Sequence, residues 1–376
     1  MKIFRYLLLF SFLLVVSCNQ AAQELTRIDV SETELTELPT ETEAATSTQT
    51  PTRTASPIPT LTPSRTPIPP TITPTPPSLS LFQSTELRVG VSPETYLQDP
   101  CSYLENRWGE GKSKPGTIVV PIMFHSVAKP GREFTEPSTI SMAYFEYFME
   151  RAKALGFSTI TVDDLVGFLE ENREIPEKSM LLILDDRRPG VTELFMPYLE
   201  ENDWTLTLGW PTTDATTDEL WARMEALAQS GRLDVQSHGH DHIYIQGYTE
   251  EEEIEEEIYK PIEVIQAHFG TTPRALIWPG GNFTQRAIQM AQEAGFKVGF
   301  TVYSRGPLMY NWIPQGVEER EMNSPLMVLP RYWSKDADIA LEQALSIGEA
   351  ARLEASKHKI EELQYLEAYC QGAQGD

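Results

Sequence analysis

Cysteine is scarce in this chain of 376 residues, which contains only three and no pair spaced as Cys-x-x-Cys. This scarcity excludes a disulfide-framework protein and a cysteine site for zinc or redox chemistry. Positive charge is scarce as well, because 30 Lys and Arg stand against 55 Asp and Glu, which gives a formal net charge of -25. Such a chain repels phosphate groups, so we expect no nucleic-acid partner and no electrostatic binding to an anionic membrane face.

A hydrophobic run long enough to cross a bilayer is also lacking, since the apolar run at 6–16 is shorter than the ~20 residues that a span needs. Two basic residues precede this run, and a signal peptide is therefore predicted at 1–17. The run ends in Val-Val-Ser-Cys, which resembles a bacterial lipobox. We expect Cys18 to carry a lipid, to become the mature N-terminus and to anchor the protein to the cell membrane outside the cytoplasm. The alternatives are an uncleaved anchor and an ordinary secretory cleavage, and both also export the chain.

The segment 18–85 is rich in Thr, Pro and Ser and has few large apolar residues. Because it cannot bury a core and its prolines favour an extended conformation, we predict a disordered linker. The remainder, 86–376, is predicted to form one folded domain. If Cys18 carries lipid, Cys101 and Cys370 are left near the two ends of this domain, and we predict a disulfide between them; two buried free thiols are the alternative.

The folded region alternates short β-rich apolar runs with amphipathic helical stretches, which indicates an α/β fold with a mainly parallel sheet. Strands are predicted at 117–124, 158–162, 180–184, 205–208, 233–236, 275–277, 297–302 and 326–329. Helices are predicted at 141–155, 163–171, 191–202, 217–230, 249–269, 284–294 and 337–368. Repeated strand–helix units of this kind are typical of a barrel.

The acidic stretch 250–257 lies within the predicted helix 249–269. These acids could form a metal or partner site. An apolar stripe at helical spacing runs beside them, however, and consists of Ile254, Ile258, Ile262 and Ile265. A solvated helix face is therefore predicted for these acids.

Polar clusters follow the first, third and fifth predicted strands, where loops of a parallel α/β fold converge on one face. They contain His125, the pair Asp185 and Asp186, and the segment 237–242. Two adjacent carboxylates cannot both point into a barrel, so one can bind a metal while the other accepts a proton. An acidic turn that caps the next helix is the alternative.

Three of the six histidines lie within 238–242. His238 and His242 are four positions apart and share one face if the segment forms a helical turn. Together with a remote carboxylate they make a set of three ligands that leaves positions for water and substrate, as in catalytic zinc sites. A hydrogen-bonded loop cluster is the alternative. His240 is expected to point outward without binding metal, and His125 either packs at a strand end or serves the site.

Five motifs between 117 and 332 resemble, in order, those of the NodB-type polysaccharide deacetylases, the family 4 carbohydrate esterases. The similarity is greatest to the exported poly-N-acetylglucosamine deacetylases, and the motifs lie at 121–127, 183–186, 237–242, 277–281 and 329–331. The resemblance implies a distorted (β/α) barrel with its core at 117–332, followed by the helix at 337–368.

The resemblance also implies roles for individual residues. Asp185 matches the catalytic base, while Asp186, His238 and His242 match the ligands of a divalent metal, zinc or a similar ion. These residues would hydrolyse an acetamide to an amine and acetate.

Three further residues of the matching motifs belong to the expected catalytic set. The backbone N–H of Gly280 is implied to be an oxyanion donor, and Arg331 an orienting cation near Asp185; His125 lies in the opening motif. The chain departs from the family pattern at Arg187, which follows the two acids, at Gly280, where the family has Tyr, and in having no late Leu-x-His motif.

The function implied is a metal-dependent N-deacetylase, a hydrolase of non-peptide carbon–nitrogen bonds, acting on an N-acetylated polysaccharide at the cell surface or outside the cell. The alternative is a catalytically impaired, deacetylase-like carbohydrate-binding lipoprotein. Arg187 distinguishes the two: a side chain turned into the metal ligands favours the binding protein, and one turned away favours the enzyme.

Overall fold

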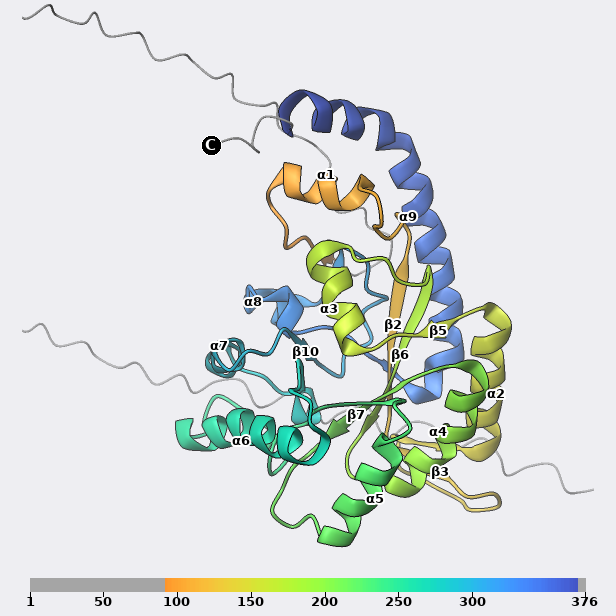
Figure 1. Ribbon diagram of the computed structural model, residues 1–376, viewed down its shortest axis with the longest axis vertical. Helices are drawn as coiled ribbons and strands as arrows, with labels where there is room; N and C mark the ends of the chain where they lie inside the picture. Colours follow the sequence, from red (N-terminus) through yellow and green to blue (C-terminus); the bar gives the residue numbers. More distant parts are fainter. Residues whose placement is uncertain (1–91, 371–376) are drawn as a thin grey trace, which may run out of the picture. The chain divides into compact units, whose positions relative to one another are not determined.

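A computed structural model of the protein describes residues 92–370 (Figure 1). The predicted signal peptide at 1–17, the linker at 18–85 and the lipidated Cys18 lie outside the described residues. Within 92–370, none of the helices combines the length and the apolar character that a membrane span requires.

A parallel sheet forms the centre of the domain. Its strands are β2 (Ile118–Phe124), β5 (Ser158–Thr159), β6 (Lys178–Asp185), β7 (Leu206–Trp210), β8 (Leu233–Ser237), β9 (Ala275–Ile277), β10 (Val298–Phe300) and β12 (Tyr332–Trp333). They are ordered β10-β9-β8-β7-β6-β2-β12, with β5 beside β6. A single bridge between Phe300 and Leu329 connects the two edges, so the sheet curls into an incomplete barrel. The predicted distorted (β/α) barrel is confirmed.

Helices follow most of the strands along the chain and pack against the sheet (Figure 1). They are α2 (Met142–Leu155), α3 (Val162–Glu171), α4 (Pro189–Asn202), α5 (Asp218–Ala228), α6 (Glu251–Phe269), α7 (Gln285–Glu293) and α9 (Ala337–Tyr365). Four of them begin at a Ser or Thr whose side chain accepts a backbone N–H of the first turn, namely Ser141, Thr161, Thr217 and Thr284. The long helix α9 packs along β2 and against α2.

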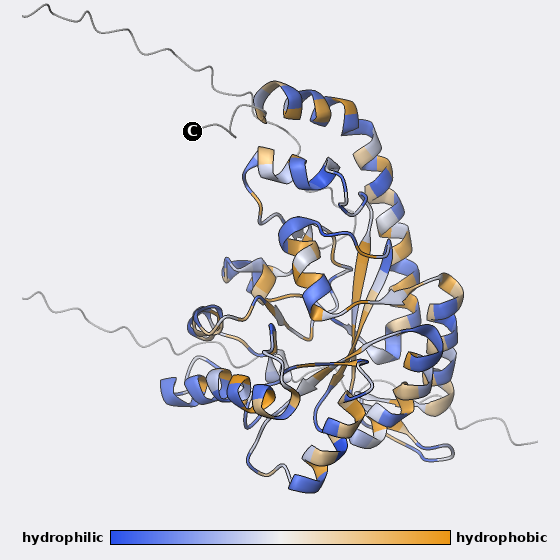
Figure 2. Ribbon diagram, viewed as in Figure 1, coloured by the Kyte–Doolittle hydropathy of each residue, from blue (hydrophilic) through white to orange (hydrophobic). Residues whose placement is uncertain are grey.

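The side chains of the central strands alternate between two apolar layers. On β2, the even-numbered residues Ile118 to Phe124 pack under the helices, whereas Val119 faces the barrel interior with Leu181 and Ile183 of β6. Figure 2 shows these apolar strands at the centre of the domain. Because strand side chains alternate with a period of two, the next odd-numbered position on β6, Asp185, also faces the interior.

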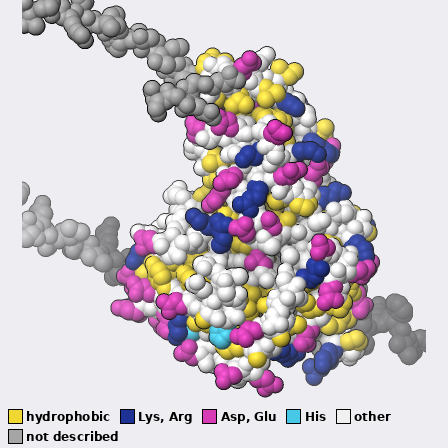
Figure 3. Space-filling view, in the orientation of Figure 1, with side chains coloured by type: hydrophobic (Ala, Val, Ile, Leu, Met, Phe, Trp, Pro, Cys, Tyr) yellow, Lys and Arg dark blue, Asp and Glu magenta, His cyan; other side chains and the backbone are white. Residues whose placement is uncertain are grey.

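Charged side chains of both signs are interspersed over the face shown in Figure 3. Several form exposed pairs between neighbouring helices, such as Lys153 with Glu201 at 2.6 Å and Arg223 with Glu193 at 2.7 Å. Exposed pairs of this kind contribute at most about 1 kcal/mol each, so the apolar layers rather than the surface charges hold the helices on the sheet.

A disulfide joins Cys101 to Cys370, with the Cα atoms 5.3 Å apart, and confirms the predicted pairing. It links helix α1 (Pro100–Trp108) to the π-helical turn η5 (Leu366–Cys370) that follows α9. The bond therefore fixes the turn after α9 to helix α1, near the start of the described residues, across a sequence separation of 269.

The predicted strand at 326–329 is wrong. Pro325–Met327 forms a 3-10 turn (η3), because the fixed φ of Pro325 suits the first position of a helical turn. Leu329 contributes only the bridge to Phe300, and the strand that pairs with β2 is β12.

The predicted strand at 158–162 is too long, since β5 ends at Thr159. Thr161 and Asp164 form a capping box, in which each side chain accepts a backbone N–H of the other residue, and this starts α3 at Val162. The C-terminal helix is close to its predicted range, although its last turn is π-helical.

Several short elements were not predicted. They are α1, α8 (Val317–Glu321) and the two strand pairs β1 (Ser92–Glu94) with β11 (Ile313–Gln315) and β3 (Ser126–Ala128) with β4 (Thr139–Ser141). Each strand has only three residues, too few to show a hydrophobic period.

Candidate metal centre and active site

The ends of β6 and β8, which flank β7, bring together the acids and histidines singled out in the sequence. Asp185 ends β6 with only 1% of its surface exposed. The next residue, Asp186, has a φ of 71°, so its side chain leaves the alternation of the strand. His238 follows the last residue of β8 and is also buried. One acid therefore points into the barrel and the other reaches the histidines, as predicted for two acids with different roles.

Asp186, His238 and His242 form a group of donor atoms that lie within 4.8 Å of one another. The His238 and His242 Nε2 atoms are 3.1 Å apart, and Asp186 Oδ1 lies 3.8 Å from the first and 3.5 Å from the second. Tetrahedral ligands at 2.0–2.1 Å from zinc are separated by about 3.3 Å. The three residues thus have the spacing and the donor chemistry that a divalent metal requires.

The orientation of His238 is fixed by a second contact. Its Nδ1 lies 2.7 Å from the carbonyl oxygen of Ile277, and because a carbonyl only accepts, Nδ1 carries the hydrogen. The lone pair of Nε2 then faces the other two donor atoms, the arrangement in which protein histidines bind metals. Burial lowers the pKa of His238 to about 4, so the ring is neutral at neutral pH.

His242 reaches the metal group in a different way from the one predicted. The segment after His238 is not helical, and His242 has a φ of 62°, in the left-handed region that is uncommon for a residue with a side chain. The expectation of a shared helical face is wrong, because a turn rather than a helix brings the two rings together. The ring of Tyr244 then packs on that of His242, with the centroids 5.5 Å apart.

Asp185 lies beside the metal group but belongs to a separate set of contacts. Its two oxygens accept hydrogen bonds from Arg331 Nη1, and its Oδ2 lies 3.8 Å from His125 Nε2 and 3.9 Å from His238 Nε2. Burial alone would raise the pKa of the Asp185 carboxyl, but the charges of Arg331, His238 and His125 lower it below its ordinary value. Asp185 is therefore an ionised carboxylate at neutral pH.

His125 is brought to the site as well, and its ring stacks on Trp333 with the centroids 6.2 Å apart. Its Nδ1 and the Nη2 of Arg331 are buried and have no hydrogen-bond partner among the described residues. Buried donors and acceptors of this kind are normally paired, so these two atoms are exceptions among the buried polar groups of the site.

The two arginines after the acids take different directions. Arg187 donates a hydrogen bond to Thr216 Oγ1 at 3.0 Å and so turns away from the metal group. Arg188 donates to Asp186 Oδ2 at 2.8 Å and to Ser126 Oγ at 2.9 Å. Since Oδ1 of Asp186 faces the histidines, Arg188 holds the carboxylate by the oxygen that a metal would not take.

Gly280 lies in the turn Pro279–Gly281 that follows β9 and has a φ of 61°. A Cβ at this position would lie 2.9 Å from the ring of Tyr244, so Tyr244 fills the space that a side chain at 280 would occupy. Tyr244 is 53% exposed at the edge of the site. Sequence reasoning missed it; its one available signal is its position two residues after a predicted ligand.

Two other residues of the histidine loop region differ from expectation. His240 is buried, not outward, and its Nδ1 lies 3.0 Å from Thr212 Oγ1; it takes no part in the metal group. Glu257, predicted to lie on a solvated face of α6, is 1% exposed. It falls three residues after Ile254 and one before Ile258, on the apolar stripe itself, and this spacing was the signal that could have identified it.

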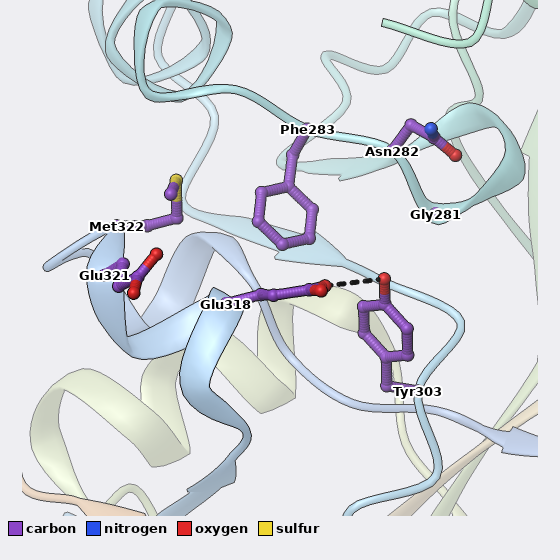
Figure 4. Close-up of a pocket in the computed structure, with 7 residues that line it drawn as sticks. All are labelled: Gly281, Asn282, Phe283, Tyr303, Glu318, Glu321 and Met322. Carbon is purple, nitrogen blue, oxygen red and sulfur yellow. Dashed lines mark hydrogen bonds between the residues drawn. The ribbon is translucent and has the colours of Figure 1, made fainter. Parts of the chain in front are cut away.

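A pocket beyond the turn at Gly280 is lined by Gly281, Asn282, Phe283, Tyr303, Glu318, Glu321 and Met322. Figure 4 shows the ring of Phe283 and the carboxylate of Glu318 directed into this pocket, where Glu318 accepts a hydrogen bond from the hydroxyl of Tyr303. None of the seven lining residues belongs to the metal group, so the chemistry-bearing side chains and this pocket are distinct.

Residues 172–299 match the family model described as polysaccharide deacetylase. The matched range contains Asp185, Asp186, His238 and His242. No curated protein sequence matches the chain.

Solved structures that are similar to the chain include the following three. The Streptococcus pyogenes deacetylase PplD, in complex with acetate, is 16% identical, with 62% of this chain and 99% of that chain covered and a TM-score of 0.50. IcaB from Ammonifex degensii is 16% identical, with coverages of 61% and 98% and a TM-score of 0.48. The BpsB deacetylase domain from Bordetella bronchiseptica is 19% identical, with coverages of 58% and 96% and a TM-score of 0.43. At these identities the likeness to PplD supports the fold.

Proposed function

We propose that this protein is a metal-dependent N-deacetylase that hydrolyses acetamido groups of a cell-surface or extracellular polysaccharide. The observation that carries the proposal is the group formed by Asp186, His238 and His242, set beside the ionised and buried Asp185. A metal centre and an adjacent general base are the two parts that metal-assisted amide hydrolysis needs.

In the proposed reaction, Asp186, His238 and His242 hold a divalent ion, with zinc the first candidate, and the ion when bound supplies Lewis acidity. Asp185 accepts the proton of the attacking water, and its contact with Arg331 keeps its carboxylate oriented. The N–H of Gly280 donates to the acetamide oxygen as negative charge develops there.

His125, whose Nε2 lies 3.8 Å from Asp185 Oδ2, relays to the leaving nitrogen the proton that Asp185 takes from the water. Water adds to the carbonyl carbon, the carbon–nitrogen bond breaks, and the products are an amine on the sugar and acetate. The complex of PplD with acetate contains the acid that this reaction releases.

The exposed ring of Tyr244 supports a carbohydrate substrate. It lies between His242 and Gly280, at the edge of the proposed metal site. An aromatic ring with a polar hydroxyl gives a sugar an apolar face to pack on and a hydrogen-bond partner. We propose that the sugar ring next to the scissile acetamide packs against Tyr244.

The alternative is a catalytically impaired, carbohydrate-binding lipoprotein. One observation favours it: Arg188 places a positive charge on Asp186, where it opposes the binding of a cation. The direction of Arg187, toward Thr216 and away from the ligands, favours the enzyme.

Metal analysis of the purified domain, combined with acetate release from a panel of N-acetylated glycans, tests the proposal. The enzyme is expected to contain about one divalent ion per chain and to release acetate from at least one polymer. A domain that binds a glycan but neither retains zinc nor releases acetate would establish the alternative instead.

We also propose that the protein is exported and anchored through a lipid on Cys18. The disulfide between Cys101 and Cys370 supports export, because structural disulfides persist in oxidising compartments outside the cytoplasm. Cell fractionation of a Cys18→Ser variant tests the anchor: the variant is expected in the soluble fraction, and its continued presence in the membrane fraction would refute lipid attachment.

A further inference from the structure

Glu257 is a carboxylate buried in α6 that has no ion-pair partner among the described residues. Burying a charged group without compensation is costly, and burial raises the pKa of Glu257 to about 7 although its contacts with backbone N–H groups act in the opposite direction. Its oxygens accept hydrogen bonds from the backbone N–H groups of His240, at 3.1 Å, and Asp241, at 2.6 Å.

Both donors belong to the loop that joins the two proposed histidine ligands. His238 precedes the two donors and His242 follows them. The loop is not helical, and it contains left-handed residues at Gly239 and His242. A left-handed conformation at a non-glycine residue costs about 1–2 kcal/mol. The loop therefore needs an external contact to retain its shape, and Glu257 supplies such a contact to two of its N–H groups.

Gly239 shows how closely the loop and the carboxylate approach each other. A Cβ added to Gly239 would lie 2.0 Å from Glu257 Oε2, and the φ of 78° also disfavours a side chain. Position 239 thus has two independent reasons to be glycine, and one of them is the carboxylate itself.

We propose that Glu257 is a positioning residue for the metal centre, which holds the loop 238–243 in the conformation that directs both histidines to one point. The inference rests on the metal site of the proposed function. Glu257 itself is not a ligand, because it contacts the backbone of the loop and acts through the shape of that loop.

The test compares Glu257→Gln with Glu256→Gln in the metal-free full chain. Glutamine has nearly the same shape, but its amide group cannot accept from all of the N–H donors that the carboxylate serves. Glu256, the neighbouring position on α6, is exposed and pairs with Lys260, so it provides a matched control.

Zinc affinity, measured by competition with a chromophoric chelator, is expected to fall at least about 10-fold in Glu257→Gln, in line with the loss of contacts that orient metal ligands. The visible absorption of bound Co²⁺ is expected to change in the same variant, because the ligand geometry changes. Glu256→Gln is expected to match the unmodified protein in both. Zinc affinity and Co²⁺ absorption unchanged in Glu257→Gln would overturn the inference.

Hydrogen exchange of the unmodified, metal-free protein keeps the inference testable if Glu257→Gln fails to fold. The amides of His240 and Asp241 are expected to exchange slowly although they lie in a loop. If they exchange at the rate of exposed loops, Glu257 does not hold the loop and the inference is overturned. If the unmodified protein binds no zinc, the proposed metal site fails while the exchange result still decides whether Glu257 holds the loop.

Discussion

Arg331 holds Asp185 in the interior of the barrel, with Nη1 2.8 Å and 2.9 Å from the two carboxylate oxygens. Both side chains are almost fully buried, and Arg331 Nε also donates to the carbonyl oxygen of Thr301 at 2.7 Å. The position of the proposed base is therefore tied to the backbone after β10, on the opposite side of the barrel from β6.

We predict that Arg331→Met destabilises the domain by about 3–5 kcal/mol, because it leaves the buried carboxylate of Asp185 without its partner. Chemical denaturation followed by circular dichroism measures the change. The double variant Arg331→Met with Asp185→Asn is expected to recover a large part of the loss, since it removes the unpaired charge. A single variant within about 1 kcal/mol of the unmodified protein would show that the pair is not needed.

The site residues at strand ends could be predicted from the sequence, because their positions follow from strand boundaries. Asp185 and Asp186 end or follow an apolar run, His238 follows the predicted strand 233–236, and parallel strands deliver such residues to one face. The pairing of Cys101 with Cys370 could be predicted because no other cysteine was left for either.

Residues that reach the site through loops or through packing could not be predicted. The position of His242 depends on its left-handed backbone conformation, which cannot be predicted from the sequence at a residue other than glycine. Tyr244 gains its place only because Gly280, far along the chain, leaves room for its ring. The burial of Glu257 could not be predicted from the acidic stretch around it, since it depends on two N–H donors that only the folded loop presents.

Substitution should separate the metal ligands from the base. Asp186→Ala and His242→Ala are expected to lose bound metal and activity together, whereas Asp185→Asn should keep the metal and lose at least about 100-fold in turnover. Elemental analysis and acetate release measure the two effects. Metal lost in Asp185→Asn but retained in Asp186→Ala would show that the two acids have been assigned in the wrong order.

Asp241→Asn supplies the control for these substitutions. Asp241 lies in the same loop, but its side chain is half exposed and is not part of the metal group. This variant is expected to keep both metal and activity. If it loses either, the effects of the other substitutions are explained by a general disturbance of the loop.

Removing the disulfide should destabilise the domain mainly through its unfolded state. The bond closes a loop across a sequence separation of 269, and its loss through Cys101→Ser with Cys370→Ser is expected to cost about 2–4 kcal/mol. Denaturation midpoints with and without reductant provide the measurement. The reduced, unmodified protein should have the same denaturation midpoint as the double variant. If reductant still lowers the midpoint of the double variant, the stabilisation does not come from this disulfide.

The buried His238 should make the stability of the metal-free domain depend on pH. Burial lowers its pKa from 6.5 to about 4, partly offset by the charge of Asp185. Between these two values the unfolded chain binds a proton that the folded chain does not, so stability falls as the pH falls from 6.5 toward 4. Above 6.5 both states are neutral at this position, and this contribution is constant.

We therefore predict that the advantage in unfolding free energy of the unmodified protein over His238→Gln shrinks by about 3 kcal/mol between pH 7 and pH 4, because glutamine cannot take up a proton. Denaturation in EDTA at a series of pH values measures this difference, and EDTA is required because a bound ion would itself keep the ring neutral. His358→Gln serves as the control, since His358 is partly exposed on α9 and lies outside the metal group; its curve should follow that of the unmodified protein. Parallel curves for the unmodified protein and His238→Gln over this range would mean that His238 titrates alike in both states, and that its ring is not held neutral by burial.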